Sequence, residues 1–86
     1  MNERTTLRIK EWFVDKEADK AARYNMFFEY FKRNENGTRI VENGYIELIC
    51  EKLAESEKAV KVTIQTGDVV GSTKGWTTWV PKSQIA

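Results

Sequence analysis

The sequence contains no histidine and a single cysteine, Cys50, among its 86 residues. Histidine is the commonest general base and metal ligand in proteins, so its absence removes the Ser–His and Cys–His pairs of nucleophilic enzymes. A lone cysteine forms no internal disulfide and supplies too few ligands for a structural zinc site. Because Cys50 lies in an apolar stretch, we expect a core side chain rather than a catalytic thiolate. We therefore expect no enzyme activity, no metal and no cofactor.

Long apolar runs are also missing, since the longest are only as long as Trp12-Phe13-Val14. A helix that crosses a membrane needs about 20 such residues. No apolar stretch follows a basic start at the N-terminus, so we expect no secretion signal, no membrane contact and a cytoplasmic location. For the same reason, the sequon Asn36-Gly37-Thr38 is expected to form a turn rather than a glycosylation site.

Neither sign of charge dominates the chain. Fourteen basic residues stand against thirteen acidic ones, which gives a net charge of +1. The two signs alternate along the sequence without a block of like charges. Strong nucleic-acid binders usually show a basic excess or stripe. The charge balance therefore disfavours tight binding to DNA or RNA.

What the sequence does contain is the composition of one small globular domain over residues 1–86. Hydrophobic residues make up 41% and charged residues 31%, which excludes a disordered tail. The length falls below the roughly 100–150 residues that are typical of a domain. We therefore expect a single domain with a thin core.

The N-terminal part of the sequence changes its pattern twice. Residues 5–14 begin with alternation and then become continuously apolar, which predicts a strand. Residues 15–23 are rich in alanine and charge, which predicts a short helix capped by Asp15. The aromatic content of residues 24–33 favours a strand, while a helix over residues 17–32 remains the alternative. As a strand, this segment has one face made of Tyr24, Met26, Phe28 and Tyr30 and another made of Asn25, Phe27, Glu29 and Phe31.

Turn signals and alternation organise the rest of the chain. Asn36-Gly37 and Asn43-Gly44 are both signals for a type I′ hairpin turn, which needs positive φ at its two central residues. Strands are predicted at residues 38–42, 45–53, 58–66 and 76–80, with a polar turn at 54–57 and a glycine-containing loop at 67–75. Pro81 is expected to end the last strand.

The predicted fold is mainly β, or α+β once the helix is counted. Its five or six short strands are joined by tight turns and form a small meander or an SH3-like barrel. One short helix is expected near residues 16–32.

Two segments of the C-terminal half carry a resemblance. Residues 47–60 read ELICEKLAESEKAV, and residues 79–85 read WVPKSQI. They are similar to a strand–turn–strand–strand element of small proteins from bacteriophages and other mobile elements, which often read Glu-Thr-(Glu/Asp)-Lys-Ala and then Trp-Ile-Pro-Lys-Ser. The resemblance covers roughly half of the chain and implies a phage or mobile-element origin, but it carries no functional residue. In this element, Trp79 is expected to cover one end of the core.

The glycine-containing loop does not match a nucleotide site. A phosphate loop of the Walker type places its lysine before the Ser or Thr and opens a helix. Here Lys74 follows Ser72 and Thr73, and a strand is predicted next. We therefore expect no nucleotide and no small-molecule substrate.

The aromatic content points to a binding function. Four Phe, three Trp and three Tyr exceed what a thin core easily hides, and protein interfaces are rich in these residues. We expect a non-catalytic protein that binds a host or phage protein. Together with the resemblance, this suggests an inhibitor of a host enzyme or defence system, such as an anti-CRISPR protein. The candidate contact residues are Tyr24, Phe27, Tyr30, Phe31, Lys74 and Trp76.

The alternative is a small β-barrel that binds single-stranded nucleic acid by stacking bases on aromatic rings. Such a face would use Trp76 and Trp79 with nearby lysines. The balanced charge places this alternative second, because phosphate contacts dominate nucleic-acid affinity. The oligomeric state stays open, because an edge strand at residues 7–14 could pair across a dimer. The lysines of the expected nucleic-acid-binding face are Lys61, Lys74 and Lys82, and Arg8 and Lys10 would extend that face.

Overall fold

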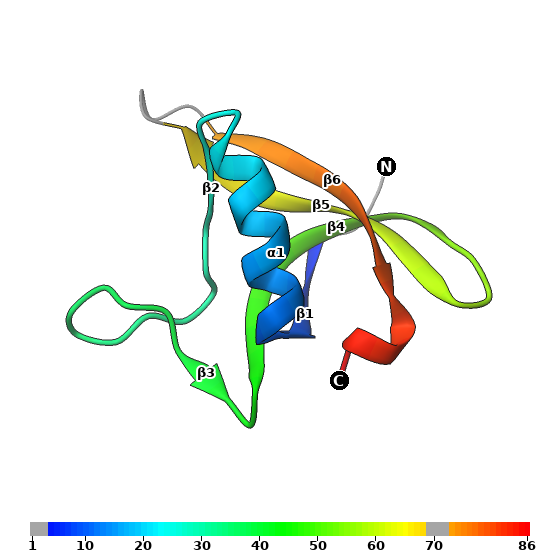
Figure 1. The fold of residues 1–86 in the computed structure, drawn as a ribbon, viewed down its shortest axis with the longest axis horizontal. Helices are drawn as coiled ribbons and strands as arrows, with labels where there is room; N and C mark the ends of the chain where they lie inside the picture. The colour runs from blue at the N-terminus through cyan, green and yellow to red at the C-terminus, as the bar shows by residue number, and fades with distance from the viewer. Residues whose placement is uncertain (1–3, 69–72) are drawn as a thin grey trace.

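The computed structural model describes residues 4–68 and 73–86. The chain is mainly β with one α-helix, as expected from the sequence (Figure 1). In chain order the elements are β1 (Arg4–Lys10), α1 (Glu11–Ala22), β2 (Met26–Phe28), β3 (Val41–Glu42), β4 (Tyr45–Glu55), β5 (Ala59–Asp68), β6 (Thr73–Pro81) and the 3-10 helix η1 (Lys82–Gln84).

Strands β4 and β5 form the centre of a single antiparallel sheet. β1 pairs with β4, and β6 pairs with the opposite edge of β5. The short strands β2 and β3 pair with the end of β5 and the start of β4. After η1 the chain returns to β1, where Ile85 bridges Ile9 and the Ala86 N–H donates to the Arg8 carbonyl at 2.9 Å. The sheet therefore curls into a partly closed, barrel-like shape.

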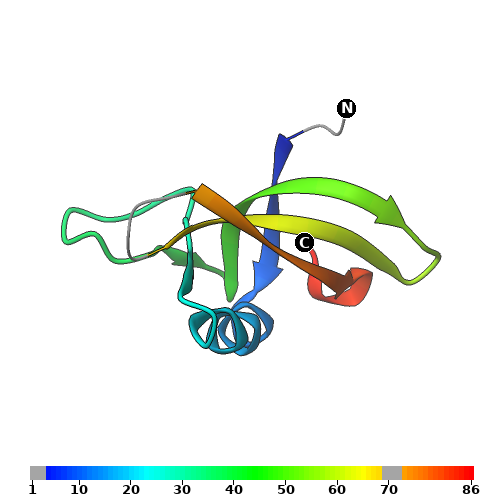
Figure 2. The ribbon, with the colours of Figure 1, turned by 90° about the horizontal axis from the view of Figure 1, so that it is seen from above.

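One face of the sheet is buried against α1, which lies along a single side of the sheet in Figure 2. Alternate residues of the long strands point to this face, so the predicted alternation is confirmed. The helix contributes Phe13, Val14 and Ala21 to the same core. Full burial of each large aliphatic side chain is worth about 1.5–3 kcal/mol. The buried strand residues are Ile9, Ile46, Leu48, Cys50, Val60, Val62, Ile64 and Val80.

The boundary between β1 and α1 differs from the prediction. The strand expected over residues 5–14 ends at Lys10, and the apolar run Trp12–Val14 belongs to the helix. Phe13, Val14, Glu17 and Ala21 are all buried, and they share one face of the helix. Asp15 lies inside the helix and does not cap it. No side chain caps the helix N-terminus, where Lys10 is the cap residue.

The segment after α1 is extended, so the alternative of a helix over residues 17–32 is wrong. Asn25, with a φ of 60°, turns the chain, and β2 then pairs with β5. Tyr30 continues this line by bridging Leu48 of β4. The two faces predicted for the strand are confirmed from Met26 onward. Met26, Phe28 and Tyr30 pack on the core, whereas Phe27 and Phe31 are exposed.

Only one of the two Asn-Gly pairs forms the predicted turn. Asn43 and Gly44 both have positive φ, 53° and 83°, and they join β3 to β4. At the other pair only Gly37 has positive φ, and the Asn34 side chain accepts hydrogen bonds from the Asn36 and Thr38 N–H groups. The strand expected at residues 38–42 accordingly shrinks to Val41–Glu42.

The later strands are longer than predicted. β4 continues to Glu55, and β5 and β6 extend into the expected loop at residues 67–75. The tip of that loop, residues 69–72, lies outside the described residues. β6 ends at Pro81 as predicted. Within the part of the chain that the structure describes, no helix is long and apolar enough to cross a membrane.

Candidate functional site

The candidate site is the face of the sheet that points away from α1, which we call the open face. Side chains alternate along a strand, so the residues between the core positions point to this side. The segment 27–31 follows the same alternation where it runs beside β5 and β4. The open face consists of Arg4, Phe27, Glu29, Phe31, Ile49, Glu51, Lys61, Thr63, Gln65, Gly75, Thr77 and Trp79.

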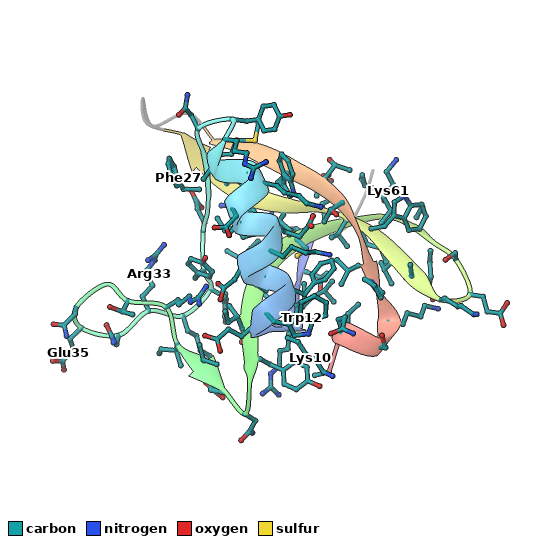
Figure 3. All side chains as sticks on the ribbon, in the orientation of Figure 1. Lys10, Trp12, Phe27, Arg33, Glu35 and Lys61 are labelled. Carbon is teal, nitrogen blue, oxygen red and sulfur yellow. The ribbon has the colours of Figure 1, made fainter. Side chains whose placement is uncertain are left out.

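Three large aromatic side chains on the open face are half exposed. Phe27 and Phe31 each keep 51% of their surface accessible, and Trp79 keeps 47%. In the β5–β6 register Trp79 stands opposite Lys61. Figure 3 labels Phe27 and Lys61, which lie towards opposite ends of the sheet. Apolar rings therefore mark both ends of the open face, and Phe31 lies beside β4, where its N–H donates to the Glu47 carbonyl at 3.2 Å.

Two adjoining hollows lie in the middle of the open face. One has a volume of about 350 Å³ and is lined by Ile49, Glu51, Gln65 and other residues of β4 to β6. The second, of about 290 Å³, lies between Phe31, Ile49 and the start of β1. Arg4 and Ile49 line both hollows, so the two hollows are adjacent.

A glycine determines the floor of the first hollow. A Cβ atom on Gly75 would overlap Cγ2 of Thr63. The missing side chain therefore lets Thr63 lie over the backbone of β6. The Thr63 hydroxyl is also held by a 2.9 Å hydrogen bond with the Thr77 hydroxyl. The floor of the hollow is thus fixed by a close approach that only glycine permits.

The polar groups of the open face carry both signs of charge. Glu29 accepts a hydrogen bond from Nε2 of Gln65 at 2.5 Å, and Oε1 of Gln65 is buried without a partner. Arg4 stands opposite Glu51 in the β1–β4 register. Acidic and basic side chains are therefore interleaved with the aromatic rings, so the face has no stripe of one sign.

The predicted contact residues do not form one surface. Phe27 and Phe31 lie on the open face, whereas Tyr24 follows α1 and its ring centroid is 5.8 Å from that of Trp76. Trp76 and Tyr30 are partly buried against the core. The guanidinium groups of Arg33 and Arg39 lie 5.2 and 5.7 Å from the Tyr30 ring centre.

Two parts of the predicted site fall outside what the structure describes. Lys74 belongs to β6 by its backbone, but its side chain is not among those described, and neither is Ser72.

The two tryptophans of β6 also differ from the sequence expectation. Trp76 packs on the core, and Trp79, which was expected to cover one end of the core, lies on the open face instead.

Glu17 is a buried carboxylate that the sequence pattern does not reveal. It is 3% exposed and accepts a hydrogen bond from Nε1 of Trp76 at 3.2 Å. Burial alone would raise its pKa, but hydrogen bonds from Thr78, Trp76 and Lys20 outweigh this effect and hold the pKa below its usual value. The charged carboxylate therefore fastens α1 to β6 and has a structural role.

The described residues offer little for metal or thiol chemistry. Among them, no group of three or more His, Cys, Asp or Glu side chains is placed to hold a metal ion. Cys50 is buried as expected, and burial raises the pKa of its thiol to about 12. The thiol is therefore protonated at neutral pH.

The sequence identified Phe27 and Phe31 but not Ile49, Arg4 or the outward orientation of Trp79. The alternation in residues 45–53 already separates Ile49 from the core positions Leu48 and Cys50. What the sequence lacked was the register that brings Ile49 beside Phe31. Comparison with known proteins gives no further guide, because no family model, curated protein or solved structure is significantly similar to the chain.

Proposed function

We propose that the chain is a non-catalytic binding protein that docks on another protein through the open face. The observation that carries this proposal is the set of three half-exposed rings, Phe27, Phe31 and Trp79, on a face with two adjacent hollows, one of them lined by Phe31. Aromatic side chains are enriched in protein interfaces and supply much of the binding energy. In the part of the chain that is described, no element covers these rings.

The charges of the open face support a protein partner over a nucleic acid. Glu29 and Glu51 stand among the aromatic residues and would repel a phosphate backbone. Arg4 and Lys61 balance them, so a partner that presents both signs of charge fits this face best. Interleaved charges of this kind favour register and specificity in protein complexes more than affinity.

A domain of this size acts on its partner mainly by occupying a surface. The proposed function therefore belongs to the inhibitor or adaptor class. If the resemblance to phage and mobile-element proteins reflects the origin of the chain, its partner is a host or phage protein. An inhibitor of a host enzyme or defence system, the anti-CRISPR class included, is the form of this function that we favour.

Binding of single-stranded nucleic acid is the second candidate, and one observation favours it. Trp79 stands beside Lys61 on the open face, an arrangement that suits base stacking next to a phosphate contact. Other members of the expected set do not support it. Trp76 turns inward, and the ammonium group of Lys82 pairs with Glu55 at 2.6 Å.

The test is affinity capture from lysate of the source cells or their host, with and without nuclease. The tagged wild-type chain is compared with Phe31→Ser and Trp79→Ser, two changes at half-exposed positions. We expect a stoichiometric protein that survives nuclease and is retained at least about tenfold less by each variant, because a central interface aromatic contributes about 2 kcal/mol or more.

Trp12→Ser is the matched control, since Trp12 is 56% exposed on α1 (Figure 3). We expect this variant to retain the partner. Equal capture by the wild type and both open-face variants would overturn the proposal. Loss of the partner after nuclease treatment would favour the nucleic-acid candidate.

A further inference from the structure

One edge of β1 has no pairing partner over its first residues among residues 4–68 and 73–86; we call it the free edge. β4 occupies the other edge along the whole strand. On the free edge, the returning C-terminal residues meet β1 at Ile9 and Arg8. Within the described residues, no backbone hydrogen bond reaches this edge between Arg4 and Leu7. The free edge is therefore a short, open template for pairing.

The backbone groups on this edge can be assigned from a single hydrogen bond. The Ala86 N–H donates to the Arg8 carbonyl, so the carbonyl of Arg8 points away from β4. In an antiparallel ladder, alternate residues direct their N–H and C=O groups to the same edge. The N–H and C=O of Thr6 therefore also point to the free edge, where a neighbouring strand would accept and donate one bond each.

An apolar hollow lies beside this edge, on the core side of β1. It has a volume of about 310 Å³ and is lined by Thr5, Leu7, Val60 and Ile85. An engineered cavity of about 150 Å³ is enough to bind benzene, so this hollow accommodates more than one small apolar side chain. At its rim, Lys52 and Lys82 both hydrogen-bond Glu55 and lower the pKa of that carboxyl to about 2.

The other side of β1 presents positive charge. Arg4 and Arg8 are exposed and flank Thr6 on the same face of the strand. Neither forms an ion pair with another described residue. A side chain opposite Thr6 on an added strand would be a diagonal neighbour of both arginines, within reach of long side chains.

We propose that the free edge of β1 binds an extended peptide segment of another protein, with an apolar–acidic–apolar pattern. The segment adds an antiparallel strand whose central residue pairs with Thr6. Its two apolar side chains, opposite Thr5 and Leu7, enter the hollow, and its acidic side chain lies between Arg4 and Arg8. Main-chain pairing supplies affinity, and the alternate side chains supply specificity. Arg4 and Thr6 also line the hollow beside Phe31, so the acidic contact adjoins the open face, whereas the apolar hollow lies on the core side of β1.

A second copy of the chain fits this edge less well than an acidic peptide. An antiparallel pair of β1 strands centred on Thr6 would place Arg4 of one copy directly opposite Arg8 of the other. Like charges directly opposite each other destabilise a strand pair. The same two arginines that attract an acidic segment therefore oppose self-pairing.

The test uses synthetic peptides and the full chain labelled with ¹⁵N. The probe is an amidated Val-Glu-Val-Ser peptide with a free N-terminus, whose first residue lies opposite Leu7 because Ala86 already lies opposite Arg8. It is compared with Val-Lys-Val-Ser and with the first peptide carrying an N-methyl group on its glutamate. We expect shifts centred on the Arg4 and Thr6 amides, about tenfold weaker binding of the lysine peptide, and at least about tenfold weaker binding of the methylated one.

Arg4→Gln combined with Arg8→Gln tests the charge contact, and Arg23→Gln, at an exposed arginine that follows α1, is the matched control. We expect the double variant to bind the glutamate and lysine peptides equally, while the control keeps the preference of the wild type. The inference is overturned if the glutamate peptide shows no binding at millimolar concentration. Shifts centred on Lys61 and Trp79 of the open face, unchanged binding of the methylated peptide, or an unchanged preference in the double variant would overturn it as well.

Discussion

At the scale of single residues, Glu17 is the most consequential polar group of the core. Its carboxylate satisfies the Trp76 indole N–H from inside the protein. Glu17→Ala would leave that donor unpaired and a cavity beside it, so we expect a loss of about 2–4 kcal/mol in the free energy of unfolding. Glu17→Gln keeps an acceptor and should lose about 1–2 kcal/mol. Urea denaturation at pH 7 measures both losses. Equal stability of the wild type and the two Glu17 variants would contradict the structural role of this carboxylate.

The lowered pKa of Glu17 also predicts a pH dependence. Its usual value is 4.5, and the folded value lies below it. The carboxylate therefore contributes stability above about pH 4.5, and this contribution is lost as the pH falls through the folded pKa. We expect the slope of unfolding free energy against pH below 4.5 to be shallower in Glu17→Gln than in the wild type. Parallel slopes would show that Glu17 is not responsible.

The contact between Gly75 and Thr63 gives another prediction at this scale. Gly75→Ala would push a methyl group into the Thr63 side chain, so we expect a loss of about 1–3 kcal/mol. Combining it with Thr63→Ala removes the clash. A double-mutant cycle in urea should therefore show that the second change offsets most of the first, with a coupling of about 1 kcal/mol or more. Additive losses would contradict the close approach.

The burial of apolar side chains was predictable from the sequence, whereas the burial of polar side chains was not. The inward positions of Cys50, Val62 and Ile64 follow from alternation alone. The burial of Glu17 does not, because its partner Trp76 is 59 residues away in sequence. Only the packing of α1 across β6 makes a buried carboxylate possible at that position.

At the scale of elements, the clearest error was the end of β1. The apolar run Trp12–Val14 fits either a buried strand or the buried side of a helix over so short a window. The run is helical because this conformation lets Phe13 and Val14 pack with Ala21 on the core. In contrast, the Asn43-Gly44 turn was predictable, because both residues adopt the positive φ that they tolerate better than others do.

Arg39 ties the segment between β2 and β4 to the helix. Its guanidinium donates to Asp15 at 2.5 Å and to Glu11 at 3.2 Å, and the bond with Asp15 raises its pKa further. These carboxylates are half exposed, so we expect Arg39→Ala to lose no more than about 1 kcal/mol of global stability. The Ile40 N–H donates to the Lys32 carbonyl at 3.4 Å, next to Arg39 in sequence, and should nevertheless exchange with deuterium faster in the variant. Unchanged exchange there would contradict the anchoring role, and Arg33→Ala is the control.

At the scale of the whole molecule, the fold has one covered face and one open face. The helix and the returning C-terminus close the core side, and the exposed rings of Phe27, Phe31 and Trp79 lie on the other, whereas Trp12 and Tyr24 are exposed on and just after the helix. The composition showed that the aromatic residues exceed the needs of the core, but which of them remain exposed depended on strand register. Sequence reasoning therefore found the kind of surface, and the structure was needed to locate it.

The most direct test of this account is hydroxyl-radical footprinting of the chain in complex with its captured partner. Trp79 and Trp12 are exposed to a similar degree in the free chain, 47% and 56%, and lie on different faces. We predict that oxidation of Phe27, Phe31 and Trp79 falls several-fold in the complex while oxidation of Trp12 is unchanged. Protection of Trp12 with full oxidation of the open-face rings would contradict the account.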